Sequence, residues 1–233
     1  MIVLQDISVI YGAGTPLEKI VLNDVNLIIE QDSFAGIIGS NGAGKSTFAK
    51  LISGEILPTK GRILVGGTDC TEYSITQRSK FIARVFQDPN IGTASNLTIL
   101  ENLMFASKRG VVRSLALATH GNHKEFFADK LKILNMGLEH KLEQKVGLLS
   151  GGQRQALSLI MATLQPAKLL VLDEHTAALD PKAADLIMEL THKVVIKNGL
   201  TALMITHNME EISYCTHLLR VGDGKIEQES LDE

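Results

Sequence analysis

The chain of 233 residues has only two cysteines and no long apolar run. Cys70 and Cys215 are far apart and lack metal-site spacing, so the sequence supports neither a disulfide framework nor a zinc site and fits a reduced compartment. The longest stretch without Asp, Glu, Lys or Arg covers residues 155–167, which is too short for a membrane span. The first residues also lack the basic region and apolar core of a signal peptide. We therefore expect a soluble, cytoplasmic protein that reaches a membrane only through a partner.

The charge of the chain gives no general attraction to nucleic acid, because the formal net charge is −3 at pH 7. A local basic run that includes Lys108, Arg109 and Arg113 is interrupted further on by Glu125 and Asp129, which favours a solvated surface over a phosphate-binding or lipid-binding face. We predict no nucleic-acid partner. The length fits one domain with a small inserted subdomain, and the sequence shows no internal repeat, low-complexity tract or linker.

The apolar pattern changes along the chain. Alternation in the first thirty residues predicts antiparallel strands joined by the turn-rich segment 11–19. From residue 34 short apolar strands are followed by helices, and residues 95–145 carry mainly helical patterns. We therefore predict a single domain, 1–233, of the α/β class. It would have a mainly parallel sheet flanked by helices, an N-terminal antiparallel β subdomain and a helical subdomain inserted at about 90–148.

The second half of the chain returns to strand–helix alternation. The pattern predicts a helix that stops near Pro166 and a buried strand at 169–174. A further helix should have Asp180 as its N-cap and Pro181 as its first residue, and should close at Gly199. A strand at 201–206 and a terminal hairpin around residues 222–224 complete the pattern.

The segment GSNGAGKST, residues 39–47, matches the phosphate-loop pattern G-x-x-x-x-G-K-[ST] between an apolar strand and a helix. Gly42 and Gly44 allow the backbone to curl so that N–H groups face phosphate oxygens, Lys45 reaches the β and γ phosphates, and the Ser46 hydroxyl binds Mg²⁺. A glycine-rich turn without a ligand is the alternative. The candidate nucleotide-binding residues are Gly39, Ser40, Asn41, Gly42, Ala43, Gly44, Lys45, Ser46 and Thr47.

The segment LLVLDE, residues 169–174, places two carboxylates at the carboxyl end of a buried strand, where open α/β sheets bind their ligands. Asp173 is a candidate to hold Mg²⁺, directly or through water, and Glu174 to accept a proton from an attacking water. Such a strand end alone is more often an ordinary turn before a helix. The phosphate loop earlier in the chain favours the catalytic interpretation.

A second candidate anion site lies in GLLSGGQRQ, residues 147–155, just before an apolar helical pattern. The hydroxyl of Ser150 and the N–H groups of Gly151 and Gly152 would lie at a helix start, which attracts anions. One small protein would then have two phosphate-binding elements about a hundred residues apart.

These segments, with LSGGQ at residues 149–153, resemble the ATP-binding cassette (ABC) family, the ATPase subunits of ABC transporters. The likeness covers essentially the whole chain in the right order. The resemblance implies a P-loop NTPase core in which Tyr11 stacks on adenine, Gln87 touches Mg²⁺ and the attacking water, and His207 lies at the γ-phosphate. Asp180 would belong to the D-loop. The alternatives are a strand-end aromatic for Tyr11, a turn residue for Gln87 and a capping histidine for His207, whereas Asp180 can also cap its helix.

The family resemblance also explains the second anion site. In ABC proteins the signature, here Ser150, Gly151, Gly152 and Gln153, completes the ATP site of the opposite subunit. The resemblance therefore implies a homodimer that encloses two ATP molecules, each held by one chain's phosphate loop and the other chain's signature.

One residue departs from the family pattern: His175 follows Glu174 where most members have proline. It is similar in this to a subgroup of bacterial importer ATPases. A transition-metal site formed with Asp173, Glu174 and His207 is an alternative.

The resemblance implies an ATP-hydrolysing, transport-coupled enzyme on the inner face of the cell membrane. It would be attached there to an integral membrane permease that works with a solute-binding protein, and residues 88–103 with the helical insertion would receive the permease. The transported solute cannot be predicted, since the permease and binding protein select it. A soluble ABC ATPase of an assembly or translation-associated machine is the alternative, and a regulator without hydrolysis is disfavoured by Glu174 and His207.

Overall fold

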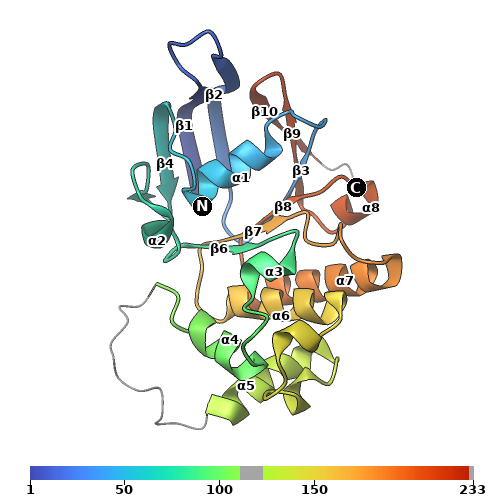
Figure 1. Ribbon diagram of the computed structural model, residues 1–233. Helices are drawn as coiled ribbons and strands as arrows, with labels where there is room; N and C mark the ends of the chain where they lie inside the picture. Colours follow the sequence, from blue (N-terminus) through green and yellow to red (C-terminus); the bar gives the residue numbers. More distant parts are fainter. Residues whose placement is uncertain (111–122, 231–233) are drawn as a thin grey trace. The chain divides into compact units, whose positions relative to one another are not determined.

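The computed structural model describes residues 1–110 and 123–230 of the chain. It divides into two compact units (Figure 1). The first, called the sheet unit, comprises Met1–Arg84, Ala167–Glu174 and Val195–Glu233. The second, called the helical unit, comprises Val85–Pro166 and His175–Val194.

The sheet unit begins with an antiparallel sheet of strand order β2-β1-β4-β5. Its strands are β1 (Ile2–Tyr11), β2 (Lys19–Ile29), β4 (Lys60–Val65) and β5 (Thr68–Asp69). The predicted antiparallel pair at the N-terminus is confirmed, with Ile2 opposite Ile29 and Tyr11 opposite Lys19. Burial alternates along most of β1 and β2, with breaks at residues 5–9 and 23–24, where the pairing of the two strands shifts its register.

A mainly parallel sheet of strand order β10-β9-β3-β8-β7-β6 follows. Its strands are β3 (Phe34–Ile38), β6 (Ile82–Val85), β7 (Leu169–Asp173), β8 (Ala202–Ile205), β9 (His217–Gly222) and β10 (Lys225–Ser230). Strand β3 pairs in parallel with β8 and β9, and β7 pairs in parallel with β8. The predicted terminal hairpin is the antiparallel pair of β9 and β10, whose turn has positive φ at Asp223 and Gly224. The predicted α/β fold with an antiparallel N-terminal part is therefore confirmed.

Helix α1 (Lys45–Ser53) contributes to the apolar core of the sheet unit. Phe48, Leu51 and Ile52 are fully buried together with strand residues of both sheets. The helix ends at Gly54, which adopts the left-handed conformation that favours glycine after a helix. Two short helices, α2 (Ile75–Arg78) and α8 (Met209–Ile212), complete this unit. The position of α1 is thus fixed by its buried face.

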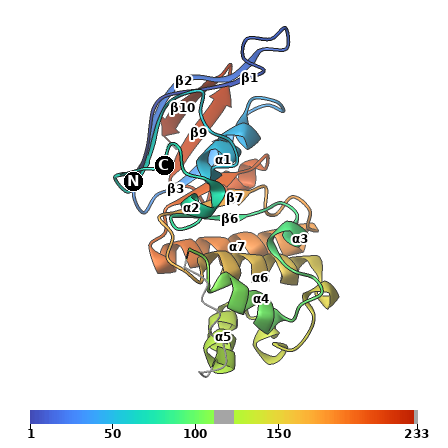
Figure 2. The ribbon, with the colours of Figure 1, turned by 60° about the vertical axis from the view of Figure 1, so that its left-hand side comes forward.

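The helical unit contains α3 (Pro89–Gly92), α4 (Ile99–Ala106), α5 (His123–Leu131), α6 (Gly151–Thr163) and most of α7 (Pro181–Asn198) (Figure 2). Three single 3₁₀ turns lie at Lys132–Leu134, Leu138–His140 and Val146–Leu148. The predicted helical insertion is confirmed as a helical region, and the unit extends beyond about 90–148 because α6 and α7 belong to it. In the described part of the chain, no helix combines the length and apolar character needed to cross a membrane.

The sequence predicts a solvated face for the basic run, but the side chain of Arg109 is partly buried. Its guanidinium donates hydrogen bonds of 2.6 Å to the carbonyl oxygen of Ala162, in the last turn of α6, and to that of Gln165, just after the helix. Burial lowers the pKa of this group below its usual value. Arg109 therefore serves the packing of α4 against α6, whereas Arg113 lies outside the described residues.

Candidate functional site

The phosphate loop lies between β3 and α1 in the sheet unit, as predicted. Gly44 precedes the first turn of α1, and no side chain caps that turn, so the helix presents its N–H groups to the loop side. The Lys45 ammonium is nearly buried and donates to the carbonyl oxygens of Gly39 (2.6 Å) and Ser40 (3.0 Å). Burial lowers the pKa of Lys45, and the nearby Glu174 carboxylate opposes that shift. The loop thus offers an anion the positive charge of the Lys45 ammonium and several backbone N–H donors.

At two positions of this loop the structure explains why the residue is glycine. A Cβ added at Gly39 would lie 2.3 Å from the carbonyl oxygen of Val221 in β9, a distance that real side chains do not reach. Gly42 has φ of 82°, in the left-handed region that favours glycine. The curled loop conformation therefore depends on the glycine spacing of the motif.

Glu174 and His207 form a pair beside this loop. Glu174 follows the last residue of β7, and its N–H donates to the carbonyl oxygen of Ile205 at the end of the neighbouring strand β8. Its φ of 46° is unusual for a residue other than glycine. The Glu174 Oε1 and His207 Nε2 atoms are 2.7 Å apart. Two adjacent parallel strands therefore bring a carboxylate and an imidazole together at their carboxyl ends.

A hollow of about 460 Å³ is formed by these elements of the sheet unit. It is lined by Tyr11, Lys19, Val21, Asn41, Gly42, Gly44, Lys45, Ser46, Thr47, Glu174 and His207. Ser40 and Ala43, with Asn41 and Gly42, also line an adjoining hollow of about 640 Å³. The structure thus brings the predicted loop residues 40–47, Tyr11, Glu174 and His207 into one region, whereas Gly39 lines neither hollow.

Asp173 is not among the residues that line this hollow. Its Oδ2 atom accepts a hydrogen bond of 2.5 Å from the guanidinium of Arg84 in β6. As oxygen donors, the Asp173 carboxylate and the Ser46 hydroxyl both suit Mg²⁺, which binds hard oxygen ligands. The chemistry of these two side chains therefore fits the predicted ion, although Asp173 already has an ionic partner.

The second anion site lies in the helical unit. Ser150 is the N-cap of α6, and its hydroxyl accepts a hydrogen bond from the Gln153 N–H while the Gln153 side chain accepts one from the Ser150 N–H. This reciprocal pair is a capping box, which sequence analysis did not anticipate. The two side chains are thus engaged with their own helix start.

Asp180 lies in the same part of the helical unit. Its carboxylate accepts a hydrogen bond from the Ala183 N–H, which confirms the predicted N-cap of α7. A hollow of about 510 Å³ brings Asp180, Ala178 and Leu179 together with Ser150, Gly151, Gly152 and Gln153. A Cβ added at Gly151 or Gly152 would meet its nearest neighbour only at ordinary contact distance, 3.5 or 3.4 Å. Packing in this unit therefore does not demand the two glycines.

Gln87 is exposed in the helical unit, two residues after the end of β6. The residue before it is held by Gln155, whose side-chain amide donates to the carbonyl oxygen of Phe86. The residue after it, Asp88, caps α3 by accepting from the Asn90 N–H. Gln87 belongs to the helical unit, whereas Ser46 and Asp173 belong to the sheet unit.

His175 is buried in the helical unit. Its Nε2 atom lies 3.0 Å from the Thr191 hydroxyl oxygen in α7. Because that hydroxyl donates to the carbonyl oxygen of Ile187, Nε2 of His175 carries the proton. Burial lowers the pKa of His175 to about 4, so the ring is neutral. No group of three or more His, Cys, Asp or Glu side chains in the described residues could hold a metal ion, which leaves the metal alternative for His175 without support.

Arg84 is the residue that sequence analysis missed. A single arginine in a strand has no motif spacing that would reveal a role. The available signal was its place near the end of a buried strand, three residues before Gln87.

A glycine loop at a helix start, with a carboxylate on the next-but-one parallel strand, is the architecture of a P-loop nucleotide-binding protein. Comparison with known proteins makes the class more specific. The family model described as ABC transporter matches residues 22–177. A tyrosine transport ATP-binding protein of Clostridioides difficile is 42% identical over 208 residues, which are 88% of this chain and 79% of that protein. A phosphonates import ATP-binding protein of Ruegeria sp. is 30% identical over 97% of this chain and 87% of that protein.

A solved structure supports the same assignment. A dimeric ATP-binding cassette in a post-hydrolysis state, bound to ADP and Pi, matches with a TM-score of 0.82 and 26% identity over 100% of both chains. The chain therefore belongs to the ABC transporter family. It is an ATP-binding protein and ATPase of that family.

Proposed function

We propose that this chain is the ATP-hydrolysing subunit of an importer, in which two copies enclose two ATP molecules and drive a separate integral membrane permease. The whole chain, 1–233, would act as one ATPase domain. The observation that carries the proposal is the division of the phosphate-binding elements between two hollows. One is built by the phosphate loop, Glu174 and His207, and the other by the signature and Asp180.

In the first hollow, the loop residues 39–47 would bind the phosphates and Tyr11 would stack on the adenine. Ser46, with Asp173 outside the lining of this hollow, would hold Mg²⁺, which neutralises phosphate charge when bound. Glu174 would accept the proton of the attacking water, and His207 would lie at the γ-phosphate. The 2.7 Å contact between Glu174 and His207 supports these roles, because it fixes the carboxylate that must receive the proton.

In the second hollow, Ser150, Gly151, Gly152 and Gln153 would meet the ATP held by the partner chain. A single helix N-terminus stabilises a negative charge by at most about 2 kcal/mol. To stabilise the charge of the transition state, the Ser150 hydroxyl and the backbone N–H groups would therefore have to act together with His207 and Mg²⁺. Glycine inside a helix costs stability relative to alanine. Because packing within the unit does not require Gly151 and Gly152, close approach of a ligand or partner explains their presence better. The dimeric state of the solved relative supports the same arrangement.

The import direction rests on relatives. One relative is named for tyrosine transport and another for phosphonates import. These two solutes differ in chemistry, so the solute of this chain stays unassigned. The chain would sit in the cytoplasm against the inner face of the membrane, attached to the permease, and a solute-binding protein would belong to the same system.

The permease would contact α3 and α4 of the helical unit. Ile91 is 66% exposed and Phe105 is 60% exposed, which leaves two large apolar side chains for a partner. The charged residues of the segment 88–103, Asp88 and Glu101, cap α3 and α4 and are unsuitable for mutation. Ile91→Ser and Phe105→Ser should keep basal ATP turnover and abolish its stimulation by the permease. Ile196→Ser, at a similarly exposed position in the sheet unit, is the control, and an equal loss in all three variants would contradict the assignment.

The experiment that tests the proposed function is purification of the tagged protein from gently solubilised membranes of its host, followed by mass spectrometry. We expect a stoichiometric integral membrane protein. Recovery of soluble partners only, with the protein absent from the membrane fraction, would contradict the transport role and favour an assembly or translation-associated machine.

A further inference from the structure

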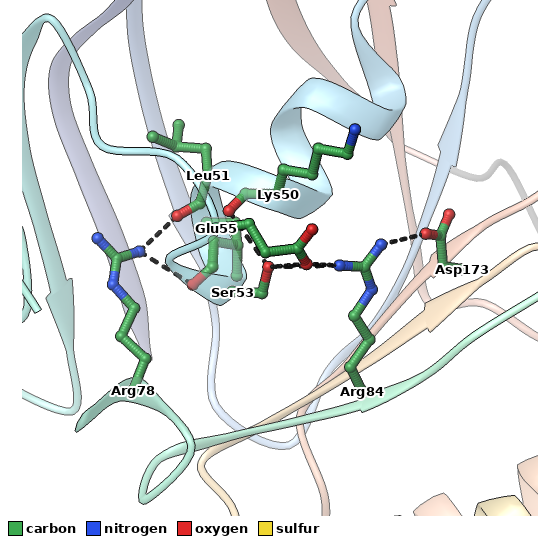
Figure 3. Close-up of polar contacts among 8 residues, drawn as sticks. Lys50, Leu51, Ser53, Glu55, Arg78, Arg84 and Asp173 are labelled. Atoms are coloured by element: carbon green, nitrogen blue, oxygen red, sulfur yellow. Dashed lines mark hydrogen bonds and ion pairs between the residues drawn. The ribbon is translucent and has the colours of Figure 1, made fainter. Parts of the chain in front are cut away.

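Arg84 connects three groups in the sheet unit (Figure 3). One of its terminal nitrogens contacts the Glu55 carboxylate and lies 3.4 Å from the Ser53 hydroxyl. The other donates to Oδ2 of Asp173 at 2.5 Å. The guanidinium thus spans from the carboxyl end of α1 to the end of β7, and its two nitrogens serve two different carboxylates.

These three side chains are shielded from solvent to different degrees. The side chains of Arg84 and Asp173 are 11% and 18% exposed, and that of Glu55 is more open at 31%. Charge-assisted hydrogen bonds are strong and directional where water is largely excluded. The orientation of the Asp173 carboxylate is therefore set by Arg84, whose own position is set by Ser53 and Glu55.

The contact also leaves Asp173 able to bind a cation. Two carboxylates contact one guanidinium, so these three side chains together carry a formal charge of −1. Within the described residues, Oδ1 of Asp173 makes no hydrogen bond, whereas Oδ2 is occupied by Arg84. If Arg84 formed an ion pair with Asp173 alone, its charge would neutralise that carboxylate. Because Arg84 also pairs with Glu55, its positive charge is shared between two carboxylates.

We propose that Arg84 is a positioning residue for the magnesium site. Held by Glu55 and Ser53, it fixes one oxygen of Asp173 and leaves the other available to hold the metal. Because α1 begins with Lys45 and Ser46 and ends beside Ser53 and Glu55, the same bridge ties Asp173 to the helix that follows the phosphate loop. Partners that orient a metal ligand commonly change metal affinity by 10- to 100-fold when removed. This inference rests on the proposed role of Asp173 in holding Mg²⁺.

Charge and positioning predict opposite results for Arg84→Met. Removing the positive charge makes the cluster more negative, so simple attraction would tighten divalent cation binding. Loss of orientation would instead weaken it. Arg84→Lys separates the two effects further, since lysine keeps the charge but has one nitrogen in place of the two that reach Glu55 and Asp173.

The experiment measures Mn²⁺ binding, by loss of the free-ion electron paramagnetic resonance signal, in the presence of a saturating non-hydrolysable ATP analogue. Affinity for a fluorescent ATP analogue in EDTA serves as the test of folding, and Arg62→Met, at an exposed arginine of β4, is the matched control. We expect Arg84→Met and Arg84→Lys to weaken Mn²⁺ binding about tenfold or more, with nucleotide affinity in EDTA unchanged. If Arg84→Met fails to bind nucleotide in EDTA, it is taken as misfolded, and Mn²⁺ binding by Arg84→Lys then tests the positioning role.

Unchanged or tighter Mn²⁺ binding in the Arg84 variants would overturn the inference. Asp173→Asn separates this failure from that of the proposed function. If Asp173→Asn weakens Mn²⁺ binding and the Arg84 variants do not, only the positioning role is wrong. If Asp173→Asn has no effect either, the proposed metal site is itself wrong.

Discussion

The buried guanidinium of Arg78 stabilises the carboxyl end of α1, and Arg78→Met should remove that support. Arg78 is 0% exposed and donates to the carbonyl oxygen of Leu51 (2.5 Å; Figure 3) and to those of Ile52 (3.0 Å) and Thr71 (2.9 Å). The first two carbonyls belong to the last turn of α1, where carbonyl oxygens lack the regular helical partner; that of Leu51 also accepts a hydrogen bond of 3.3 Å from the Gly54 N–H. Methionine has a similar length but no donor.

The size of the effect follows from these three contacts. Each buried carbonyl that loses its partner costs about 1 kcal/mol or more. Removal of the buried charge returns part of its desolvation cost, consistent with burial lowering the pKa of Arg78. The Leu51 carbonyl keeps the Gly54 N–H, so we expect a net loss of about 2 kcal/mol, which lowers Tm by about 4–8 °C in a chain of this length.

The assay is thermal and urea unfolding of the purified protein followed by circular dichroism. Arg62→Met replaces an exposed arginine of β4 and should change stability by less than about 0.5 kcal/mol. If Arg78→Met unfolds at the same temperature as Arg62→Met, the capping role of Arg78 is refuted.

Two further predictions concern the cysteines and the glycines. Cys70 and Cys215 are buried, and burial raises the pKa of both thiols, that of Cys215 to about 12. A thiol reagent at pH 8 should therefore label neither in the native protein and both after unfolding, and rapid native labelling would contradict their burial. Gly39→Ala should abolish nucleotide binding because its Cβ has no room beside Val221, whereas Gly151→Ala should fold and bind ATP but weaken ATP-dependent dimerisation. Equal nucleotide affinity in both glycine variants would contradict the loop geometry.

The parts of the site that could be predicted from the sequence are formed by residues that are neighbours in the chain. The phosphate loop, the strand that ends in Asp173 and Glu174, and the cap of α7 by Asp180 each depend on residues within one turn or one strand end. The antiparallel N-terminal strands were predictable for the same reason, since alternation of apolar residues specifies a half-buried strand.

The parts that it missed depend on partners distant in sequence. Arg84 and Asp173 are 89 residues apart, and no spacing rule pairs them. The burial of His175 against Thr191 likewise requires knowledge of which face of α7 it meets. The capping box of Ser150 and Gln153 is different, because its pattern S-x-x-Q is local and can be read from the sequence.

The central claim is that two copies of this chain share each ATP site, and sedimentation of the Glu174→Gln variant tests it most directly. Loss of the carboxylate should block hydrolysis but not binding, so saturating Mg-ATP should convert the variant from monomer to dimer. The double variant Glu174→Gln, Ser150→Arg should bind ATP but stay monomeric, because its signature no longer fits a partner's nucleotide. If Glu174→Gln binds Mg-ATP yet remains monomeric, or the double variant dimerises equally well, the shared-site account is contradicted.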